Sequence, residues 1–193
     1  MIKVRNLDKE FVIQVYHEHL VKDFIPAEQK PLDIITGLMD RGLYICYGLY
    51  DEEEFVAYAF FMKVEGYQDL LIDYFAVCSE VRSCGYGSRF LSLLASELTE
   101  YDNIIFEVES GKDAKDEQEL AVCKKRLEFY HRNGLKDTKL KVSLFGCDMV
   151  ILYLQLHKAP TDDSLEEALD AIYDTMFGKD LHKRCVIVSR VRE

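Results

Sequence analysis

The stretch EVRSCGYGSRF, from Glu80 to Phe90, follows the apolar run DLLIDYFAV and opens an amphipathic segment. Its two glycines, Gly85 and Gly87, stand one residue apart, and Arg82 precedes them. Glycine adopts backbone angles that other residues avoid, and it lets a ligand approach the chain closely. Successive N–H groups in such a loop, with the positive end of the following helix, can bind a phosphate group. The stretch therefore predicts either a phosphate-binding loop or a plain turn between a strand and a helix.

Two common phosphate loops do not fit this stretch. A dinucleotide-binding GxGxxG loop needs a third glycine where this chain has Phe90, and a Walker A loop needs Gly-Lys-Ser/Thr, which is missing. The pattern that remains is Arg-x-x-Gly-x-Gly at a strand-to-helix junction. Taken alone, this pattern leaves both the binding loop and the structural turn open.

The segments around the loop predict an α/β protein. Apolar patterning predicts strands at residues 2–7, 43–50, 54–64, 69–77, 103–109, 139–145 and 147–156. Helical spacing predicts helices at residues 9–22, 32–39, 90–101 and 117–132. Asp116 suits the start of the last helix, and Asn133–Gly134 suits its end. Helices that separate strands in this order are typical of an α/β fold.

An extension follows Pro160. Ser164 and Glu167 are predicted to form a capping box, and Gly178 is predicted to end the helix. The helix carries an apolar stripe made of Leu165, Leu169, Ile172, Tyr173, Met176 and Phe177. The run RCVIVSRV then predicts a strand. We expect a domain at residues 1–158 and an extension at 159–193 that packs on this domain, forms a homodimer contact or walls a substrate site.

Composition excludes several classes of function. The 193 residues carry 35 acidic and 24 basic side chains and a net charge of −11, which disfavours broad binding to nucleic acid or anionic membranes. The apolar run MVILYLQLH is far shorter than the roughly 20 residues of a membrane span. Charges in MIKVRNLDKEF argue against a signal peptide, so we expect a cytoplasmic protein without a membrane partner. The six cysteines form no CxxC pair and show no zinc spacing, which predicts reduced thiols and no metal site.

Two motifs resemble those of a known family. The run YFAVCSEVRSCGYGSRFLSLL resembles the acetyl-CoA signature of the GCN5-related N-acetyltransferases (GNAT superfamily), Arg/Gln-x-x-Gly-x-Gly/Ala. The run RLEFYHRNGL resembles their aromatic-Tyr-x-x-x-Gly-aromatic stretch, with Leu135 where a Phe is usual. The run IFEVE resembles the strand before that helix, although the loop between them is longer and lacks a clear match to the family's asparagine. The order of elements agrees over about residues 1–157.

The resemblance implies a fold and a cofactor. The fold is a GNAT-like acyl-CoA N-acyltransferase fold, with a central mixed sheet flanked by helices. The strands at 69–77 and 103–109 would splay apart, and the pantetheine arm of acetyl-CoA would lie between them. Backbone groups of Phe75, Ala76 and Val77 would pair with that arm. The pyrophosphate would be bound by the loop, whose residues are Arg82, Ser83, Cys84, Gly85, Tyr86, Gly87 and Ser88.

The resemblance also implies a reaction: direct transfer of the acetyl group from CoA to a primary amine of a small molecule or peptide. Glu107 matches the family's glutamate base, and Glu109 and Asp73 are the alternatives. Glu107 could instead form a structural ion pair with Lys125 or Arg126.

Tyr130 matches the family's proton-donating tyrosine, and its alternative role is that of a core aromatic with a bonded hydroxyl. The competing reading of the whole chain is a non-catalytic acyl-CoA-binding regulatory module. The presence of both Glu107 and Tyr130 favours the enzyme.

Overall fold

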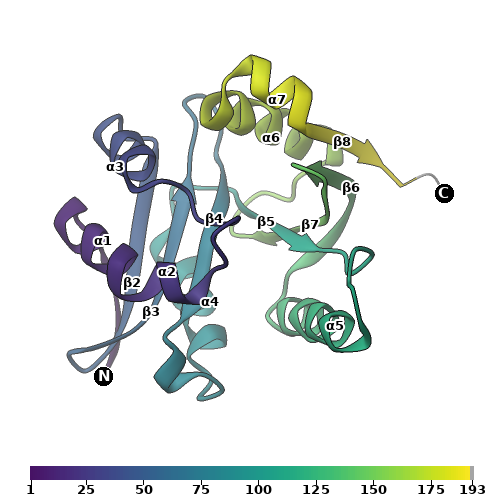
Figure 1. Cartoon of the computed structure of the whole chain (residues 1–193). Helices are drawn as coiled ribbons and strands as arrows, with labels where there is room; N and C mark the ends of the chain where they lie inside the picture. Colours follow the sequence, from purple (N-terminus) through teal and green to yellow (C-terminus); the bar gives the residue numbers. More distant parts are fainter. Residues whose placement is uncertain (192–193) are drawn as a thin grey trace. The chain divides into compact units, whose positions relative to one another are not determined.

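Residues 1–191 are described by a computed structural model (Figure 1). They form two units, and the strand β4 (Asp69–Val77) contributes to both. The first unit comprises Met1–Lys63 and Ile72–Leu98, and the second comprises Val64–Leu71 and the residues from Thr99 onward. The strands and the main helices follow one another in the predicted order, so the α/β class is confirmed.

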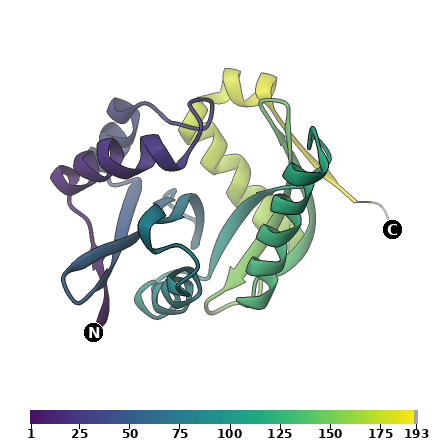
Figure 2. The ribbon, with the colours of Figure 1, turned by 60° about the horizontal axis from the view of Figure 1, so that its bottom comes forward.

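The first unit is built on antiparallel strands. Its strands besides β4 are β1 (Ile2–Asn6), β2 (Tyr44–Asp51) and β3 (Glu54–Met62). Strands β2 and β3 form a hairpin in which Asp51 pairs with Glu54. The side chains of β3 from Val56 to Met62 are all buried, because helices cover this sheet on both sides (Figure 2).

The helices of the first unit lie on two faces. Those before β2 are α1 (Lys9–Val15), the π-helical turn η1 (Tyr16–Leu20), α2 (Val21–Asp23) and α3 (Leu32–Asp40). Those after β4 are the 3₁₀ turn η2 (Ser79–Val81) and α4 (Tyr86–Glu97). Figures 1 and 2 show α1 to α3 on one side of the strands and α4 on the other. The predicted helix at 9–22 is therefore present, but a π turn interrupts it.

The second unit continues the sheet from the start of β4. Its other strands are β5 (Asn103–Glu109), β6 (Lys136–Leu144), β7 (Cys147–Gln155) and β8 (Val186–Arg190). Asp69, Leu70 and Leu71 pair in parallel with Asn103, Ile104 and Ile105. The pairs β5–β7, β6–β7 and β6–β8 are antiparallel. The full strand order is β1-β2-β3-β4-β5-β7-β6-β8, which makes the sheet mixed, as predicted.

The second unit has helices on both faces of its strands. They are α5 (Glu117–Arg132), α6 (Asp162–Phe177) and α7 (Lys179–Cys185). Figures 1 and 2 show α5 on the face of β5 and β7 opposite to α6. The Asp116 carboxylate accepts a hydrogen bond from Glu119 N at 2.8 Å, which confirms the predicted start of α5.

The predicted capping box at the start of α6 is wrong. The cap is Thr161, whose backbone is extended and whose Oγ1 accepts from Ser164 N at 3.1 Å. Ser164 lies three residues into the helix and accepts from Thr161 N at 3.0 Å through its own hydroxyl. The same two motif positions are thus used three residues earlier than we predicted. Gly178 does end α6, with φ of 76°.

The C-terminal extension is part of the second unit. Within α6, Leu165, Leu169, Ile172 and Tyr173 are buried, which follows from the apolar stripe. The predicted strand is β8, which pairs with β6, whereas α7 was not predicted. The boundary at residue 158 remains a prediction.

Two further features bear on the sequence analysis. All six cysteines are free thiols, and of these Cys46, Cys78 and Cys123 are buried. Within residues 1–191, no helix has both the length and the hydrophobicity that a bilayer crossing requires.

Candidate functional site

The glycine loop leaves the first turn of α4 open. Ser83 and Gly85 both adopt left-handed backbone angles, with φ of 67° and 84°. Gly85 is the N-cap of α4, where no side chain caps the helix, and the first turn, all of it described, contains no acidic residue. The first N–H groups of a helix lack partners within that helix. The N–H groups of Tyr86, Gly87 and Ser88 therefore suit an anion, which the positive end of the helix dipole also favours.

A buried aspartate anchors the loop. Arg82 Nη2 donates to Asp23 Oδ1 at 2.5 Å, and its Nε donates to the Val77 carbonyl at 3.1 Å. The Asp23 side chain, only 6% exposed, also accepts from the Tyr58 hydroxyl at 3.0 Å. Burial, followed by the neighbouring Asp23 charge, raises the pKa of Tyr58, so the phenol remains a donor. The guanidinium thus fixes the loop to α2 and to the end of β4.

The remaining predicted cofactor residues lie around the same loop. Phe75 stacks on Phe90 of α4 with ring centroids 5.7 Å apart, and the Tyr86 hydroxyl donates to Asp51 Oδ2 at 2.8 Å. These contacts fix α4 against its own unit. The predicted residues that remain partly or fully exposed are Phe75, Ala76, Val77, Arg82, Ser83, Cys84, Gly85, Tyr86, Gly87 and Ser88.

Asp73, the first alternative base, is tied within the first unit. Its carboxylate accepts a short hydrogen bond from the Tyr44 hydroxyl and lies 3.3 Å from Lys30 Nζ. Burial, followed by the charge of Asp73, raises the pKa of Tyr44 well above its usual value. Asp73 is thus a partly buried carboxylate held by a cation and a phenol.

Glu107 lies in the second unit and contacts helix α6. Alternation along β5 turns Glu107 away from Phe106. Its Oε1 accepts a hydrogen bond from the Tyr173 hydroxyl of α6 at 2.5 Å. Burial, followed by the charge of Glu107, raises the pKa of Tyr173, so the phenol keeps its proton and donates.

Glu109, the second alternative base, takes the cation that we considered for Glu107. Arg126 Nη1 donates to Glu109 Oε2 at 2.9 Å, and the Cys123 thiol lies 3.8 Å from the same oxygen. Of the two cations that we considered for Glu107, Arg126 thus binds the neighbouring carboxylate of Glu109.

Tyr130 lies on the other face of β5. Its ring packs against Phe106 and Phe129, with centroids 5.2 and 5.3 Å away. Its hydroxyl makes no hydrogen bond with any residue that the structure describes, so the alternative of a core tyrosine with a bonded hydroxyl is not observed. Burial raises the pKa of Tyr130, and Arg126 opposes this. Tyr130 and Glu107 therefore lie at opposite faces of β5.

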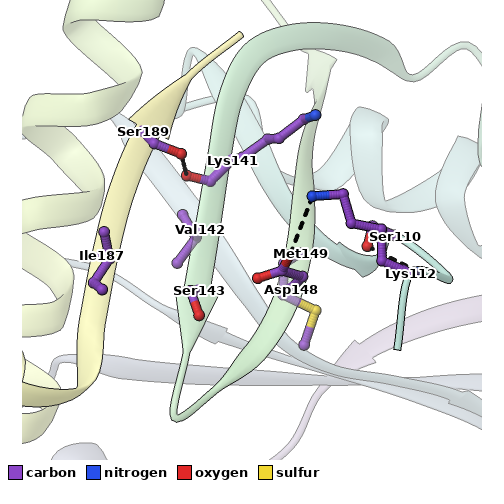
Figure 3. Close-up of a pocket in the computed structure, with 9 residues that line it drawn as sticks. All are labelled: Ser110, Lys112, Lys141, Val142, Ser143, Asp148, Met149, Ile187 and Ser189. Carbon is purple, nitrogen blue, oxygen red and sulfur yellow. Dashed lines mark hydrogen bonds and ion pairs between the residues drawn. The ribbon is translucent and has the colours of Figure 1, made fainter. Parts of the chain in front are cut away.

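Each unit also carries a small surface pocket. The first unit has one of about 220 Å³, lined by Glu18, His19, Lys22, Asp23, Ser79 and Glu80. The second unit has one of about 90 Å³, shown in Figure 3 and lined by Ser110, Lys112, Lys141, Val142, Ser143, Asp148, Met149, Ile187 and Ser189. Lys112 Nζ donates to Asp148 Oδ2 at 3.2 Å across the second pocket. Neither of these two pockets is lined by the predicted catalytic or cofactor residues.

Two side chains that contact the candidate residues were not predicted. Tyr173 was assigned only to the apolar stripe of α6, and Asp23 was not singled out. Their partners lie 66 and 59 residues away in sequence. Helical periodicity therefore predicts neither the Tyr173–Glu107 contact nor the Asp23–Arg82 contact.

Comparison with known proteins places this geometry in a fold family. No protein-family model and no curated protein sequence matches the chain. Among solved structures, a protein of Bacteroides thetaiotaomicron assigned to the GNAT family of acetyltransferases is similar, with a TM-score of 0.71 and 20% identity. The match covers 91% of this chain and 98% of that one.

Two further structures agree. The ribosomal-protein-S18-alanine N-acetyltransferase of Escherichia coli matches with a TM-score of 0.59 and 18% identity, over 84% of this chain and 98% of that chain. A Bacillus subtilis acetyltransferase in complex with CoA matches with a TM-score of 0.53 and 17% identity, over 80% and 99%. The GNAT-like fold implied by the two sequence motifs is therefore confirmed.

Proposed function

We propose that this chain, which has the fold of the GCN5-related N-acetyltransferases, transfers an acetyl group from acetyl-CoA to a primary amine of a small molecule or peptide. The observation that carries the proposal is the Arg-x-x-Gly-x-Gly loop, which leaves the N-terminus of α4 uncapped. A similar fold binds CoA in the Bacillus subtilis structure. Among the neighbours, the Escherichia coli protein acts on an alanine of a ribosomal protein, which supports an amine acceptor here.

The loop and the end of β4 would hold the donor. We assign the pyrophosphate to the N–H groups from Ser83 to Ser88, where the helix dipole favours negative charge. Cys78 N donates to the Val56 carbonyl on β3, so the N–H and C=O of Val77 face away from β3. The Val77 carbonyl accepts from Arg82, which leaves the Val77 N–H for the pantetheine arm. In this assignment the Arg82 side chain fixes the shape of the loop through Asp23 and the Val77 carbonyl.

The reaction needs a base, because an alkylammonium with a pKa near 10.4 is only about one part in a few thousand free amine at pH 7. Glu107 would accept the ammonium proton. The amine nitrogen then attacks the thioester carbon, the new C–N bond forms, and the C–S bond breaks. Tyr130 would give its proton to the departing sulfur, and the second proton released by the acylated nitrogen would return to Tyr130 through solvent. Each of these two proton transfers typically accelerates a reaction by about 10²–10⁴.

The environments of Asp73 and Glu109 argue against these two carboxylates as the base. A neighbouring cation stabilises the ionised form of a carboxylate and lowers its affinity for a proton. Asp73 lies beside Lys30, and Glu109 is bonded to Arg126. Glu107 accepts a hydrogen bond from the neutral phenol of Tyr173.

The opposite faces of Glu107 and Tyr130 fit two separate roles. One face of β5 would carry the proton acceptor, and the other would carry the proton donor. The base would then meet the amine, and the acid would meet the thiolate, without the two side chains neutralising each other.

A panel of small amines and peptide N-termini, incubated with acetyl-CoA and read by mass spectrometry, tests the proposal. We expect acetylation of at least one class of amine. Saturable acetyl-CoA binding without turnover on any amine would instead support the non-catalytic acyl-CoA-binding module. The absence of both binding and turnover would contradict the two functions together.

A further inference from the structure

Helix α6, in the C-terminal extension, places a hydroxyl beside the candidate base. Tyr173 is fully buried in α6, and its hydroxyl bonds to Glu107 Oε1 at 2.5 Å. A tyrosine hydroxyl donates a hydrogen bond without adding a charge beside the carboxylate. A neutral donor orients the carboxylate and still leaves it able to take up a proton.

Two ring contacts fix the position of this hydroxyl. The Tyr173 ring stacks on Phe177, with centroids 6.1 Å apart and planes 14° apart. It also contacts the His182 ring of α7 at 5.5 Å. His182 Nδ1 is in turn 2.8 Å from Asp174, and its Nε2 is 3.6 Å from Asp170. A side chain locked by packing holds its hydrogen-bond partner in one geometry, as a catalytic base requires.

We propose that Tyr173 is a positioning residue for acyl transfer: through Glu107, it makes the C-terminal extension part of the active site. This inference rests on the proposed function, in which Glu107 removes the proton of the acceptor amine. The inference gives the extension at 159–193 a role within one chain. A dimer contact is not needed to explain why Tyr173 is buried.

The hydrogen bond has a consequence for pH. A donor to the ionised form of a carboxylate stabilises that form, so protonation needs a lower pH. Burial and the charge of Glu107 raise the pKa of Tyr173, so the phenol donates over the whole working range. The other titratable groups around Tyr173 are Asp170, Asp174 and His182. Beyond them, Glu109 and Arg126 form their own pair at the end of β5.

Tyr173→Phe removes the hydroxyl and keeps the stacked ring. A hydrogen bond to a charged group contributes enough to move a titration by about one pH unit or more. We therefore expect the acidic limb of the profile of kcat/KM against pH to shift upward by about one unit. Activity on the alkaline plateau should also fall, because Glu107 is no longer held in one geometry. Thr175→Val is the matched control, because it removes a hydroxyl from α6 that bonds only within the helix, to the Ala171 carbonyl.

A second substitution should shift the acidic limb of the profile of kcat/KM against pH in the opposite direction. Site-specific 3-fluorotyrosine at position 173 keeps the fold and makes the phenol a stronger donor, so the acidic limb should move to lower pH. If Tyr173→Phe fails to fold, the fluorinated protein still decides the question. A limb that moves in neither variant overturns the inference and leaves Tyr173 a packing residue.

A readout without turnover separates the two proposals. The carboxyl ¹³C resonance of Glu107, assigned through Glu107→Gln, can be titrated in the parent, Tyr173→Phe and Thr175→Val. We expect an upward shift of its midpoint in Tyr173→Phe alone. A shifted midpoint in a protein that acetylates no amine would support the contact and contradict the transferase. An unshifted midpoint in an active enzyme would overturn the role of Tyr173 and leave the transferase standing.

Discussion

At the scale of single residues, the candidate bases differ in what holds them. Asp73 and Glu109 are each bonded to a cation, whereas a buried tyrosine donates to Glu107. A carboxylate that already neutralises a cation gains little by accepting a proton from an ammonium group. We propose Glu107 as the base because of its place in the IFEVE motif.

Glu107→Gln keeps the shape of the side chain and removes the base. We expect turnover at pH 7 to fall by about 10²–10⁴. Activity should partly recover as the pH approaches the amine pKa of about 10.4, because the amine then loses its proton unaided. A profile of rate against pH on one accepted amine checks this, with Glu109→Gln for comparison. A Glu107→Gln enzyme as fast as the parent at pH 7 would move the role to Glu109 or Asp73.

Tyr130→Phe tests the acid. The ring would still pack against Phe106, so binding of acetyl-CoA, measured by calorimetry, should be unchanged. Turnover should fall by roughly 10²-fold or more. Raising the pH should not restore it, since the departing thiolate still lacks a donor. Full activity of this variant would remove Tyr130 from the mechanism.

Sequence could identify the residues of the motifs but not their partners. Glu107 and Tyr130 stand in recognisable runs, and the structure adds Tyr173 and Asp23 beside candidate residues. Both contacts join segments that are distant in sequence. Tyr173 belongs to the apolar stripe of α6, and the periodicity of that stripe would be the same without the Tyr173 hydroxyl.

At the scale of elements, the long periodic segments were predictable and the short irregular ones were not. The strands and the helices α3, α4 and α5 fall close to their predicted positions, because each buries one regular face. The π turn η1 and the short helix α7 were missed. The π turn η1 adds only one residue to a helical turn, which the apolar pattern does not reveal. Helix α7 has seven residues, too few for a clear helical period. The cap of α6 was misplaced because Thr161 and Ser164 both have capping side chains.

The apolar face of α6 makes its own prediction. Ile172 is fully buried, so Ile172→Asp would bury a charge in place of a hydrocarbon side chain. Truncation of a buried Ile alone costs about 2–5 kcal/mol, and the unpaired charge adds to it. We expect a severe loss of thermal stability, measured by melting, whereas Ile172→Val should cost only about 0.5–1.5 kcal/mol. Equal melting temperatures for the parent and Ile172→Asp would show that the helix is not packed as described.

At the scale of the whole molecule, the order of elements and the two motifs predicted the fold. Seven of the predicted strands, their helices and the glycine loop follow one another as the GNAT resemblance implies, and solved GNAT structures cover 80–91% of the chain. Sequence alone could not specify the acceptor, because no motif in this chain encodes it. The net charge of −11 is compatible with a cationic amine.

The binding of acetyl-CoA at the glycine loop is the claim on which the reaction depends. Thermal melting with and without acetyl-CoA tests it most directly in the parent, Gly87→Glu and Gly37→Glu. At about 100 times its dissociation constant, the ligand should stabilise the parent by roughly 2.7 kcal/mol. Gly87→Glu should lose this gain through crowding and like charge, whereas Gly37→Glu, whose added Cβ meets no atom within 4 Å, should keep it. A parent that does not respond to acetyl-CoA, or a Gly87→Glu variant stabilised as much as the parent, would contradict the account.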